Sequence, residues 1–439
     1  MKTRKSFLIS SLLALLAVTP VVGAEKAMTL TLEKAIEIAM DENPTIKVSG
    51  LEIERQEYVK KQTKGNLYPS LSTEAGYMRT LIHSETGGYA MTSDNTFSVD
   101  ATLAVPLFAP AVYRTLKLND IEMQSAVESA RSSKVTLASE VKIAYYNILV
   151  AEESLLVLNE SEKTMQETVD QTQVMFDNGL ASEYDLLTAQ VQLNNLKPTI
   201  IQTKNSINTA KLLFKMYLSL PSEVDITLNG KLEDFVTSTM SFSRDLANNT
   251  DIRNLELQDQ MLAQQLKILK TQRMPTLAAY GSLAFSSAST SEFSAMFSSM
   301  SQTTPDKYTT QWPLYAGVTL SIPIFNGFTK INQEKQAKNS ISQLKLQKSY
   351  LEQSVKVQLE SAVNSIITAS EQMQANKLTV EQAAKAYKIS NVRYTTGTGT
   401  ILELNSAELS KTQAQLNYSQ AVYDYLSAEA DYQKILGNQ

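Results

Sequence analysis

The sequence feature that most restricts the fold of this chain is a stretch without glycine or proline from Phe328 to Thr396. Such a stretch can continue one helix without a break, and at about 1.5 Å per residue it predicts a helix of about 100 Å. A second stretch of this kind follows Gly397 and runs from Thr400 to Leu436. Because only a short turn separates the two, the sequence predicts an antiparallel helical hairpin over about residues 328–436.

Apolar and small side chains recur along both predicted helices at alternating steps of three and four residues. This spacing places them on one stripe of each helix and is typical of helices that pack along their whole length. The stripes consist of Val355, Leu359, Ala362, Ile366, Ala369, Met373, Val380, Ala383, Tyr387 and Tyr394 on the outgoing helix, and of Leu404, Ala407, Ala414, Tyr418, Ala421, Tyr425, Ala428, Tyr432 and Ile435 on the return helix.

The same pattern occurs 218 residues earlier, where Gly179 takes the place of Gly397. The earlier stripes consist of Leu137, Val141, Ala144, Ile148, Ala151, Leu155, Leu158, Met165, Val169 and Phe176, and then of Leu186, Ala189, Leu193, Leu196, Ile200, Ile207, Ala210, Phe214 and Tyr217. This shared register indicates a duplicated unit. It predicts a first helical hairpin over about residues 111–219.

Alternation replaces the heptad pattern ahead of each long helix. Phe97, Val99, Ala101 and Leu103 alternate with polar residues such as Asp100, which predicts an amphipathic strand. The two copies predict β-hairpins over about residues 70–107 and 276–325, with the strand length and pattern of outer-membrane barrels. Four strands cannot close a barrel, and an open edge in lipid leaves backbone groups unpaired at several kcal/mol each. Three copies would supply twelve strands, so we expect several chains to share one barrel.

The predicted organisation has four parts. A basic start, an apolar core of about twelve residues and a small-residue site at 22–24 predict a signal peptide over residues 1–24. The first structural repeat spans residues 25–220. A linker spans 221–243, and the second repeat spans 244–439.

Composition excludes several classes of function. The chain has no cysteine and one histidine, so it offers neither a disulfide framework nor a thiolate metal site. His83 has no other histidine or cysteine to share a metal with, and no nucleophile and base pattern is present. The net charge of -5 provides no basic face for nucleic acid. We therefore expect no enzyme activity, no cofactor, no metal site and no nucleic-acid partner.

The order of these elements and four short motifs resemble the TolC-like outer membrane efflux protein family over essentially the whole mature chain. The motifs are Tyr68-Pro-Ser-Leu71, Ile322-Pro-Ile-Phe325 and the two hairpin tips at 176–189 and 394–407. The resemblance implies a mainly α fold with a small β portion. It implies a homotrimer in which a twelve-stranded β-barrel within the outer membrane lipid continues into a long α-helical barrel in the periplasm.

The resemblance also implies a function and partners. It implies a passive trimeric exit duct for small molecules or proteins, with porin activity, in a tripartite efflux or type I secretion system. The implied partners are a periplasmic adaptor (membrane fusion) protein and an RND or ABC pump of the inner membrane. Both a proton-driven and an ATP-driven pump remain open. So does a second function from another class, a secreted or periplasmic coiled-coil structural or adhesive protein without a pore. The duplicated amphipathic strands favour the duct, because a filament needs no such hairpins.

Position by position, the resemblance implies roles for residues at the two tips. The implied adaptor-docking residues are Gly179, Leu180, Gly397 and Thr398. The implied residues of the entrance gate are Asp185, Glu403 and Tyr394, of which the two acidic residues line the constriction. Two positions depart from the family pattern. Ser406 stands where well-known members have a second aspartate, and Gly399 replaces a basic residue. These departures predict a weaker gate or one held by other contacts.

Overall fold

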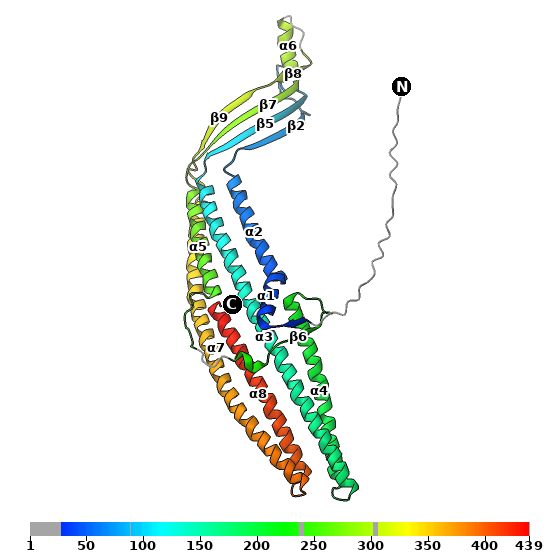
Figure 1. Cartoon of the computed structure of the whole chain (residues 1–439). Helices are drawn as coiled ribbons and strands as arrows, with labels where there is room; N and C mark the ends of the chain where they lie inside the picture. Colours follow the sequence, from blue (N-terminus) through cyan, green and yellow to red (C-terminus); the bar gives the residue numbers. More distant parts are fainter. Residues whose placement is uncertain (1–27, 88, 237–240, 302–305, 439) are drawn as a thin grey trace, which may run out of the picture.

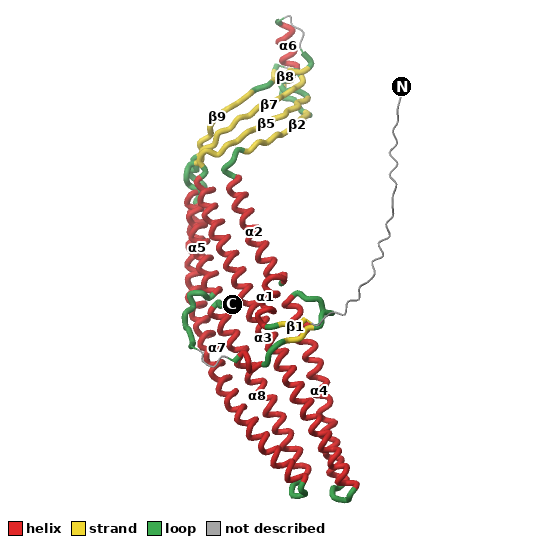
Figure 2. Tube along the Cα trace, in the orientation of Figure 1, coloured by secondary structure: helices red, strands yellow, loops and turns green. Residues whose placement is uncertain are grey.

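The computed structural model describes residues 28–87, 89–236, 241–301 and 306–438 (Figure 1). The predicted signal peptide at residues 1–24 lies outside the described residues. The chain is elongated, with a β-sheet at one end and, at the other, the two turns that each connect a pair of antiparallel helices (Figure 2). Long helices connect the two ends.

Two helical hairpins dominate the fold and confirm the predicted ones. The first combines α3 (Pro110–Asp177) with α4 (Glu183–Leu218), and the second combines α7 (Thr329–Thr395) with α8 (Ile401–Leu436). The remaining α-helices of the described residues are α1 (Leu32–Glu42), α2 (Pro44–Gly65), α5 (Thr250–Thr271) and α6 (Glu292–Met300). α4 continues through Pro198 as one helix.

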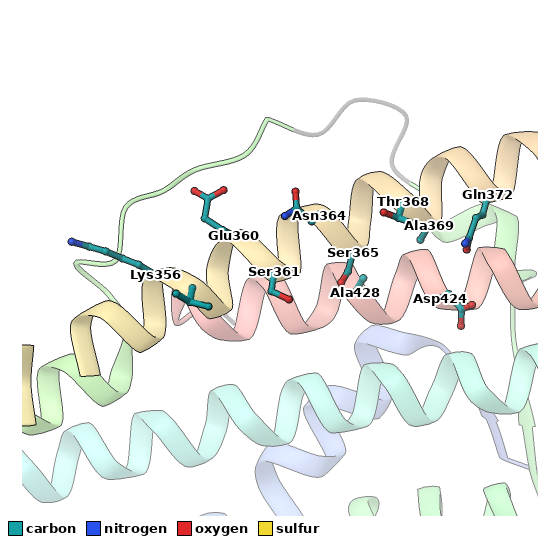
Figure 3. A pocket seen from close by; sticks show the side chains of 11 residues that line it. Lys356, Glu360, Ser361, Asn364, Ser365, Thr368, Ala369, Gln372, Asp424 and Ala428 are labelled. Atoms are coloured by element: carbon teal, nitrogen blue, oxygen red, sulfur yellow. The ribbon is translucent and has the colours of Figure 1, made fainter. Parts of the chain in front are cut away.

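The contacts between helices give a corresponding order at two levels of the molecule, in which α4 and α8 at one level take the places of α2 and α5 at the other. Next to the sheet the order is α2, α3, α5 and α7, and next to the tips it is α4, α3, α8 and α7. α3 and α7 thus belong to both levels, and α7 and α8 lie side by side (Figures 1 and 3). Because α7 is an edge helix, its stripe positions from 373 to 387 are only half-buried and the residues between them are exposed. On α3, by contrast, the stripe faces neighbours on two sides.

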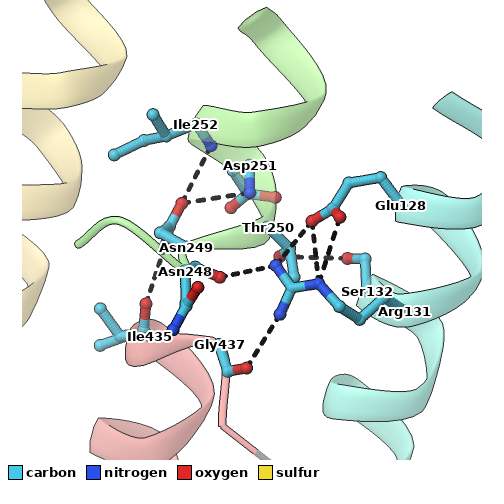
Figure 4. A network of polar contacts seen from close by, with 10 residues as sticks. All are labelled: Glu128, Arg131, Ser132, Asn248, Asn249, Thr250, Asp251, Ile252, Ile435 and Gly437. Carbon is cyan, nitrogen blue, oxygen red and sulfur yellow. Dashed lines mark hydrogen bonds and ion pairs between the residues drawn. The ribbon is translucent and has the colours of Figure 1, made fainter. Parts of the chain in front are cut away.

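Two asparagines join helices that meet end to end. Asn43 caps α2 by accepting from Thr45 N at 2.8 Å, and its Nδ2 donates to Tyr217 O at the end of α4 at 2.9 Å. Asn249 caps α5 in the same way, and its Nδ2 donates to Ile435 O at the end of α8 at 2.7 Å (Figure 4). Each asparagine satisfies backbone groups of two helix ends at once, so α4 and α8 are continued by α2 and α5.

The same junction is tied to the long helix α3. The guanidinium of Arg131 donates to Asn248 O at 2.6 Å and to Gly437 O at 3.0 Å, while it also pairs with Glu128 (Figure 4). Gly437 has a positive φ of 76°, and an added Cβ would lie 2.0 Å from Asn248 O. Only glycine fits this close approach.

The main sheet is antiparallel. It contains β2 (Ser70–Arg79), β5 (Asn95–Phe108), β7 (Thr276–Ser289), β8 (Tyr308–Gln311) and β9 (Leu314–Ser321). β2 pairs with β5, β5 with β7, and β7 with both β8 and β9, so the latter two occupy one position in the sheet. Two smaller sheets pair β1 (Met28–Leu30) with β6 (Ile226–Leu228) and β3 (Glu85–Thr86) with β4 (Tyr89–Ala90).

The second β-hairpin differs from its predicted extent of 276–325. Its return strand is interrupted between Gln311 and Leu314 and already ends at Ser321. Pro313 lies in this gap and lacks an N–H, although its carbonyl still accepts from Ala284 N at 3.0 Å. The connection between the strands also contains α6, which forms in a segment rich in serine, threonine and methionine.

The largest apolar core lies halfway along the molecule, where helices and small strands meet. Tyr145, Phe214, Leu218 and Ile226 are fully buried in it. The Tyr145 hydroxyl lies 3.1 Å from Leu30 O and 2.5 Å from Asn229 O. The 3-10 helix η1 (Leu232–Phe235), within the predicted linker, contacts α3 and α8 there. This segment is therefore part of the core and not only a connection.

Candidate functional site

The two hairpin turns have the same backbone geometry. Gly179 and Gly397 have φ values of 75° and 72°, which is the left-handed region that glycine adopts without steric cost. In the first turn Leu180 N donates to Met175 O at 2.8 Å, and in the second Thr398 N donates to Arg393 O at 2.8 Å. The hydrogen bonds match at the 218-residue offset, so the duplication extends to the tips.

Both turns project into open space. A Cβ added at Gly179 or Gly397 would meet no described atom within 4 Å, and Leu180 is 75% exposed. The four residues with an implied docking role, Gly179, Leu180, Gly397 and Thr398, are therefore accessible at one end of the molecule (Figure 1).

Asp185 serves as a capping residue of α4. Its N–H donates to Ser182 Oγ at 3.2 Å, and its carboxylate accepts from Ser182 N at 3.0 Å. This reciprocal pair is a capping box, which fixes the side chain against the first turn of the helix. The negative charge also lies at the positive end of the helix dipole.

Glu403 occupies the equivalent position on α8 but has a different partner. Its N–H donates to Thr400 Oγ1 at 3.2 Å, while its carboxylate forms an ion pair with Arg393 at 3.1 Å. Arg393 is the last basic residue before the turn, and the sequence analysis did not select it. The pair is about half exposed, so solvent screening weakens it.

Tyr394 connects the two hairpins. It is 5% exposed, and its hydroxyl lies 2.7 Å from Thr172 Oγ1 on α3. Since the Thr172 hydroxyl already donates to Thr168 O at 2.8 Å, Tyr394 is the donor of this bond. Burial raises the pKa of Tyr394, which keeps the phenol protonated as a donor. Thr172 is a functional residue beyond those expected from the sequence, where it is a polar residue within the apolar stripe of α3.

An apolar cluster surrounds this hydrogen bond. It comprises Met165, Val169, Ala189, Leu193, Tyr394, Ile401 and Leu404, which come from α3, α4, α7 and α8. The structure therefore places Tyr394 between the hairpins, whereas Asp185 and Glu403 lie at equivalent positions of separate hairpins, where Asp185 is half-buried and Glu403 is exposed. The tips of one chain are held together by a small core with one buried hydrogen bond in it.

The register of the sheet separates polar from apolar side chains. The polar face carries Ser72, Glu74, Ser98, Asp100, Thr102, Ser282, Ser286, Tyr315 and Thr319, and the other face carries Leu71, Ala75, Tyr77, Phe97, Val99, Leu103, Leu283, Phe285, Leu314, Val318 and Leu320. Neighbouring strands agree in this division, with exceptions at Thr73 and Arg79 on the apolar face and at Met78 and Tyr280 on the polar face. One face thus suits water and the other suits hydrocarbon.

Both edges of the chain are uncovered in the described structure. β2 pairs only with β5 and β9 only with β7 among the described strands, so each has one open side. Along the helices, large apolar side chains are exposed on the two edge positions, namely Val48, Leu51, Tyr58, Leu187, Val191 and Ile201 on α2 and α4, and Leu346, Tyr350, Val357, Leu378, Ile389 and Val392 on α7. A chain with two open edges is suited to join further copies.

Further polar features of the described residues lie away from the tips. A groove of about 730 Å³ lies between α7 and α8, where Lys356, Glu360 and Asn364 point away from α8 (Figure 3). Glu360 accepts from Arg244 Nε at 2.7 Å. His83 lies beside Asp94, with Nε2 at 3.2 Å from its carboxylate. None of the helices in the described part of the chain has the length and apolar character of a membrane span.

Comparison with known proteins gives consistent matches. The family model described as outer membrane efflux protein matches residues 35–213 and 242–438. Outer membrane protein TolC of Escherichia coli (strain K12) is 22% identical over 370 residues, which cover 83% of this chain and 73% of TolC. TolC of Salmonella enteritidis is 22% identical over 372 residues, with the same two shares.

Solved structures share the fold. The outer-membrane channel OprN has a TM-score of 0.76 at 16% identity, covering 93% of this chain and 90% of that chain. The open state of the MtrE outer membrane channel of Neisseria gonorrhoeae has a TM-score of 0.73 at 20% identity, covering 93% of this chain and 89% of that chain.

Proposed function

This chain belongs to the outer membrane efflux protein family, and on that premise we propose that it forms the passive exit duct of a tripartite export system. It is an outer membrane channel protein that extends into the periplasm. The proposal concerns how the chain completes the channel, what closes its entrance and which partners it meets.

The observation that carries the proposal is the order of strands and helices. β2 continues α2, β5 leads into α3, β7 continues α5 and β9 leads into α7, so the sheet order equals the helix order next to it. One rotation that brings β9 of a copy beside β2 of the next also brings α7 beside the next α2 and α4. Three copies then close a barrel of twelve strands and a helical tube together.

The two repeats, residues 25–220 and 244–439, each contribute a β-hairpin and a helical hairpin to this wall. The polar sheet face lines the water-filled interior and the apolar face contacts lipid. With both edges covered, no backbone group of β2 or β9 remains unpaired in the membrane.

At the entrance, Asp185 and Glu403 of three copies would place six carboxylates around a narrow opening. Such a ring attracts cations and repels anions. Tyr394 holds the two hairpins of each chain together through Thr172, and Arg393 pairs with Glu403. These two contacts would hold the entrance if the departures at Ser406 and Gly399 are compensated by other contacts and do not simply weaken the gate.

The exposed turns are the proposed docking sites for a periplasmic adaptor protein. The adaptor would connect the duct to a pump of the inner membrane, either an RND or an ABC protein. The duct itself supplies no energy, and small molecules or proteins pass through it.

The experiment is to purify the protein from outer membranes and test it for trimers and for conductance in planar bilayers. Val318→Arg on the apolar face should reduce assembly, because a cation facing the middle of the membrane costs about 2–4 kcal/mol. Thr319→Arg, its neighbour on the polar face, should assemble normally. Equal assembly of both variants, or a monomer without conductance, would favour a coiled-coil protein without a pore.

A further inference from the structure

A buried carboxylate lies between the two helical hairpins. Glu408 of α8 is 3% exposed, and its Oε2 has no hydrogen-bond partner among the described residues. The Thr412 hydroxyl lies 3.4 Å from Oε1 of Glu408 and 2.9 Å from Ser161 Oγ on α3. The side chain therefore sits at the contact between α8 and α3, which belong to different hairpins.

The charges around this site do not balance. Lys411 of α8 has its Nζ 3.9 Å from Glu408 Oε2 and 3.6 Å from Glu160 Oε1 on α3. From α7, the ring of Tyr387 lies 4.9 Å from the same Nζ. Burial raises the pKa of this phenol, and the charges of Glu408 and of Glu167 on α3 raise it further. One ammonium thus serves two carboxylates at close range, and one added proton would balance the group.

Glu408 is the carboxylate that binds this proton. Burial raises its pKa above the usual range of glutamate, and the charge of Lys411 and the hydrogen bonds of Ser161 and Thr412 offset this only in part. Glu160 is the more exposed of the two carboxylates, with 57% of its side chain accessible. Separation of α8 from α3 would hydrate Glu408 and stabilise its charged form.

We propose that Glu408 is a proton-binding residue that tightens the contact between the two hairpins in acid and loosens it as the pH rises. This inference rests on the proposed function, and it adds the premise that opening of the entrance separates α8 from α3. Since the packed state binds the proton more strongly than the separated state, protonation favours the packed state. The stabilisation is fully present below the ordinary glutamate pKa and is lost as the pH rises through the raised value.

The size of the effect follows from proton linkage. One proton per chain changes the ratio of open to closed states by at most about tenfold per pH unit, and three concerted chains change it by at most about a thousandfold. The bond between Tyr394 and Thr172 adds no response near neutral pH, because burial raises the phenol pKa further above this range. Glu408 is therefore a positioning residue that acts on the entrance through helix packing.

The test measures the open fraction of full-length trimers in planar bilayers from about pH 5 to about pH 8. The wild-type open fraction should rise with pH. Glu408→Gln mimics the protonated state and should give a low open fraction with a flat profile. Glu408→Asp can still titrate and should keep a pH response with a shifted midpoint. Glu381→Gln, which replaces an exposed glutamate on α7, is the matched control and should resemble wild type.

A second readout does not depend on conductance. The chain has no cysteine, so Leu180→Cys and Thr398→Cys can carry spin labels at the exposed tips. The distance between the two labels of one chain should increase with pH when Glu408 is present and stay constant when Glu408→Gln is added. The inference would be overturned if Glu408→Gln kept the wild-type pH profile. If Glu408→Gln does not assemble, a wild-type midpoint in Glu408→Asp would overturn it instead. Either outcome would leave the proposed duct intact. Absence of any conductance, with normal label distances, would instead refute the duct.

Discussion

Replacement of Tyr394 by phenylalanine tests the buried link between the hairpins. The change removes the hydroxyl that donates to Thr172 Oγ1 at 2.7 Å and leaves the ring in its apolar cluster. Thr172 still donates to Thr168 O, so only an acceptor loses its partner. We expect the closed state to lose stability without loss of the fold.

The magnitude follows from the loss of one neutral hydrogen bond. Such a bond contributes about 1 kcal/mol, which corresponds to about a fivefold change in an equilibrium. If three chains open together, the change is about 3 kcal/mol and on the order of a hundredfold in the open-to-closed ratio. The open fraction in planar bilayers, and entry of large antibiotics into cells, should therefore rise strongly.

The controls separate this link from general effects of substitution. Tyr184→Phe removes an exposed hydroxyl near the same tips and should leave opening unchanged. Thr172→Val keeps the shape of threonine, and the double variant with Tyr394→Phe should show a coupling of about 1 kcal/mol. Additive effects of the two changes, or a wild-type open fraction in Tyr394→Phe, would refute the argument.

Three further predictions concern the tips and the sheet. Gly179→Leu and Gly397→Leu should cost about 1–2 kcal/mol each through backbone strain, since nothing obstructs the side chain. Trimers should persist while adaptor pull-down and efflux fall, and Gly50→Ala in α2 should leave both of these readouts unchanged. Asp185→Asn with Glu403→Gln removes the charges but keeps hydrogen-bonding oxygens near both helix ends, so the cation-to-anion permeability ratio and divalent-cation block should fall in bilayers; unchanged selectivity would exclude the ring. Glu74 and Asp100 face each other across β2 and β5, so Glu74→Gln should relieve repulsion and raise the dissociation temperature of trimers by a few degrees, whereas Ser72→Gln on the same face should not.

The helical hairpins could be predicted in detail because their pattern is local and repeated. Stretches without glycine or proline fix where the helices run, and the heptad stripes identify their buried faces. Gly179 and Gly397 could be placed in the turns because a tight reversal requires a positive φ. The amphipathic strands were also evident, since alternation over about ten residues is a clear signal.

The polar contacts between hairpins could not be predicted. A heptad pattern shows which face of α8 is buried, but the register of α8 against α3 depends on tertiary packing. Thr172 and Glu408 therefore carried no partner in the sequence, although both lie on buried faces. The interruption at Pro313 was a missed local signal, whereas α6 forms in a segment whose composition favours a loop.

The equal lengths of the return helices have a consequence for the reach of the molecule. α4 and α8 each contain 36 residues, and both are continued by another helix at an asparagine junction. The turns of one chain thus finish at a common level, and rotational symmetry would make them a flat rim. Removing one heptad from each helix of a single helical hairpin would retract its turn by about 10 Å, so that the rim would no longer be flat. Removing matching heptads from both helical hairpins would shorten the whole duct evenly and leave the β-sheet unchanged. The length of these helices therefore sets the distance that the duct spans.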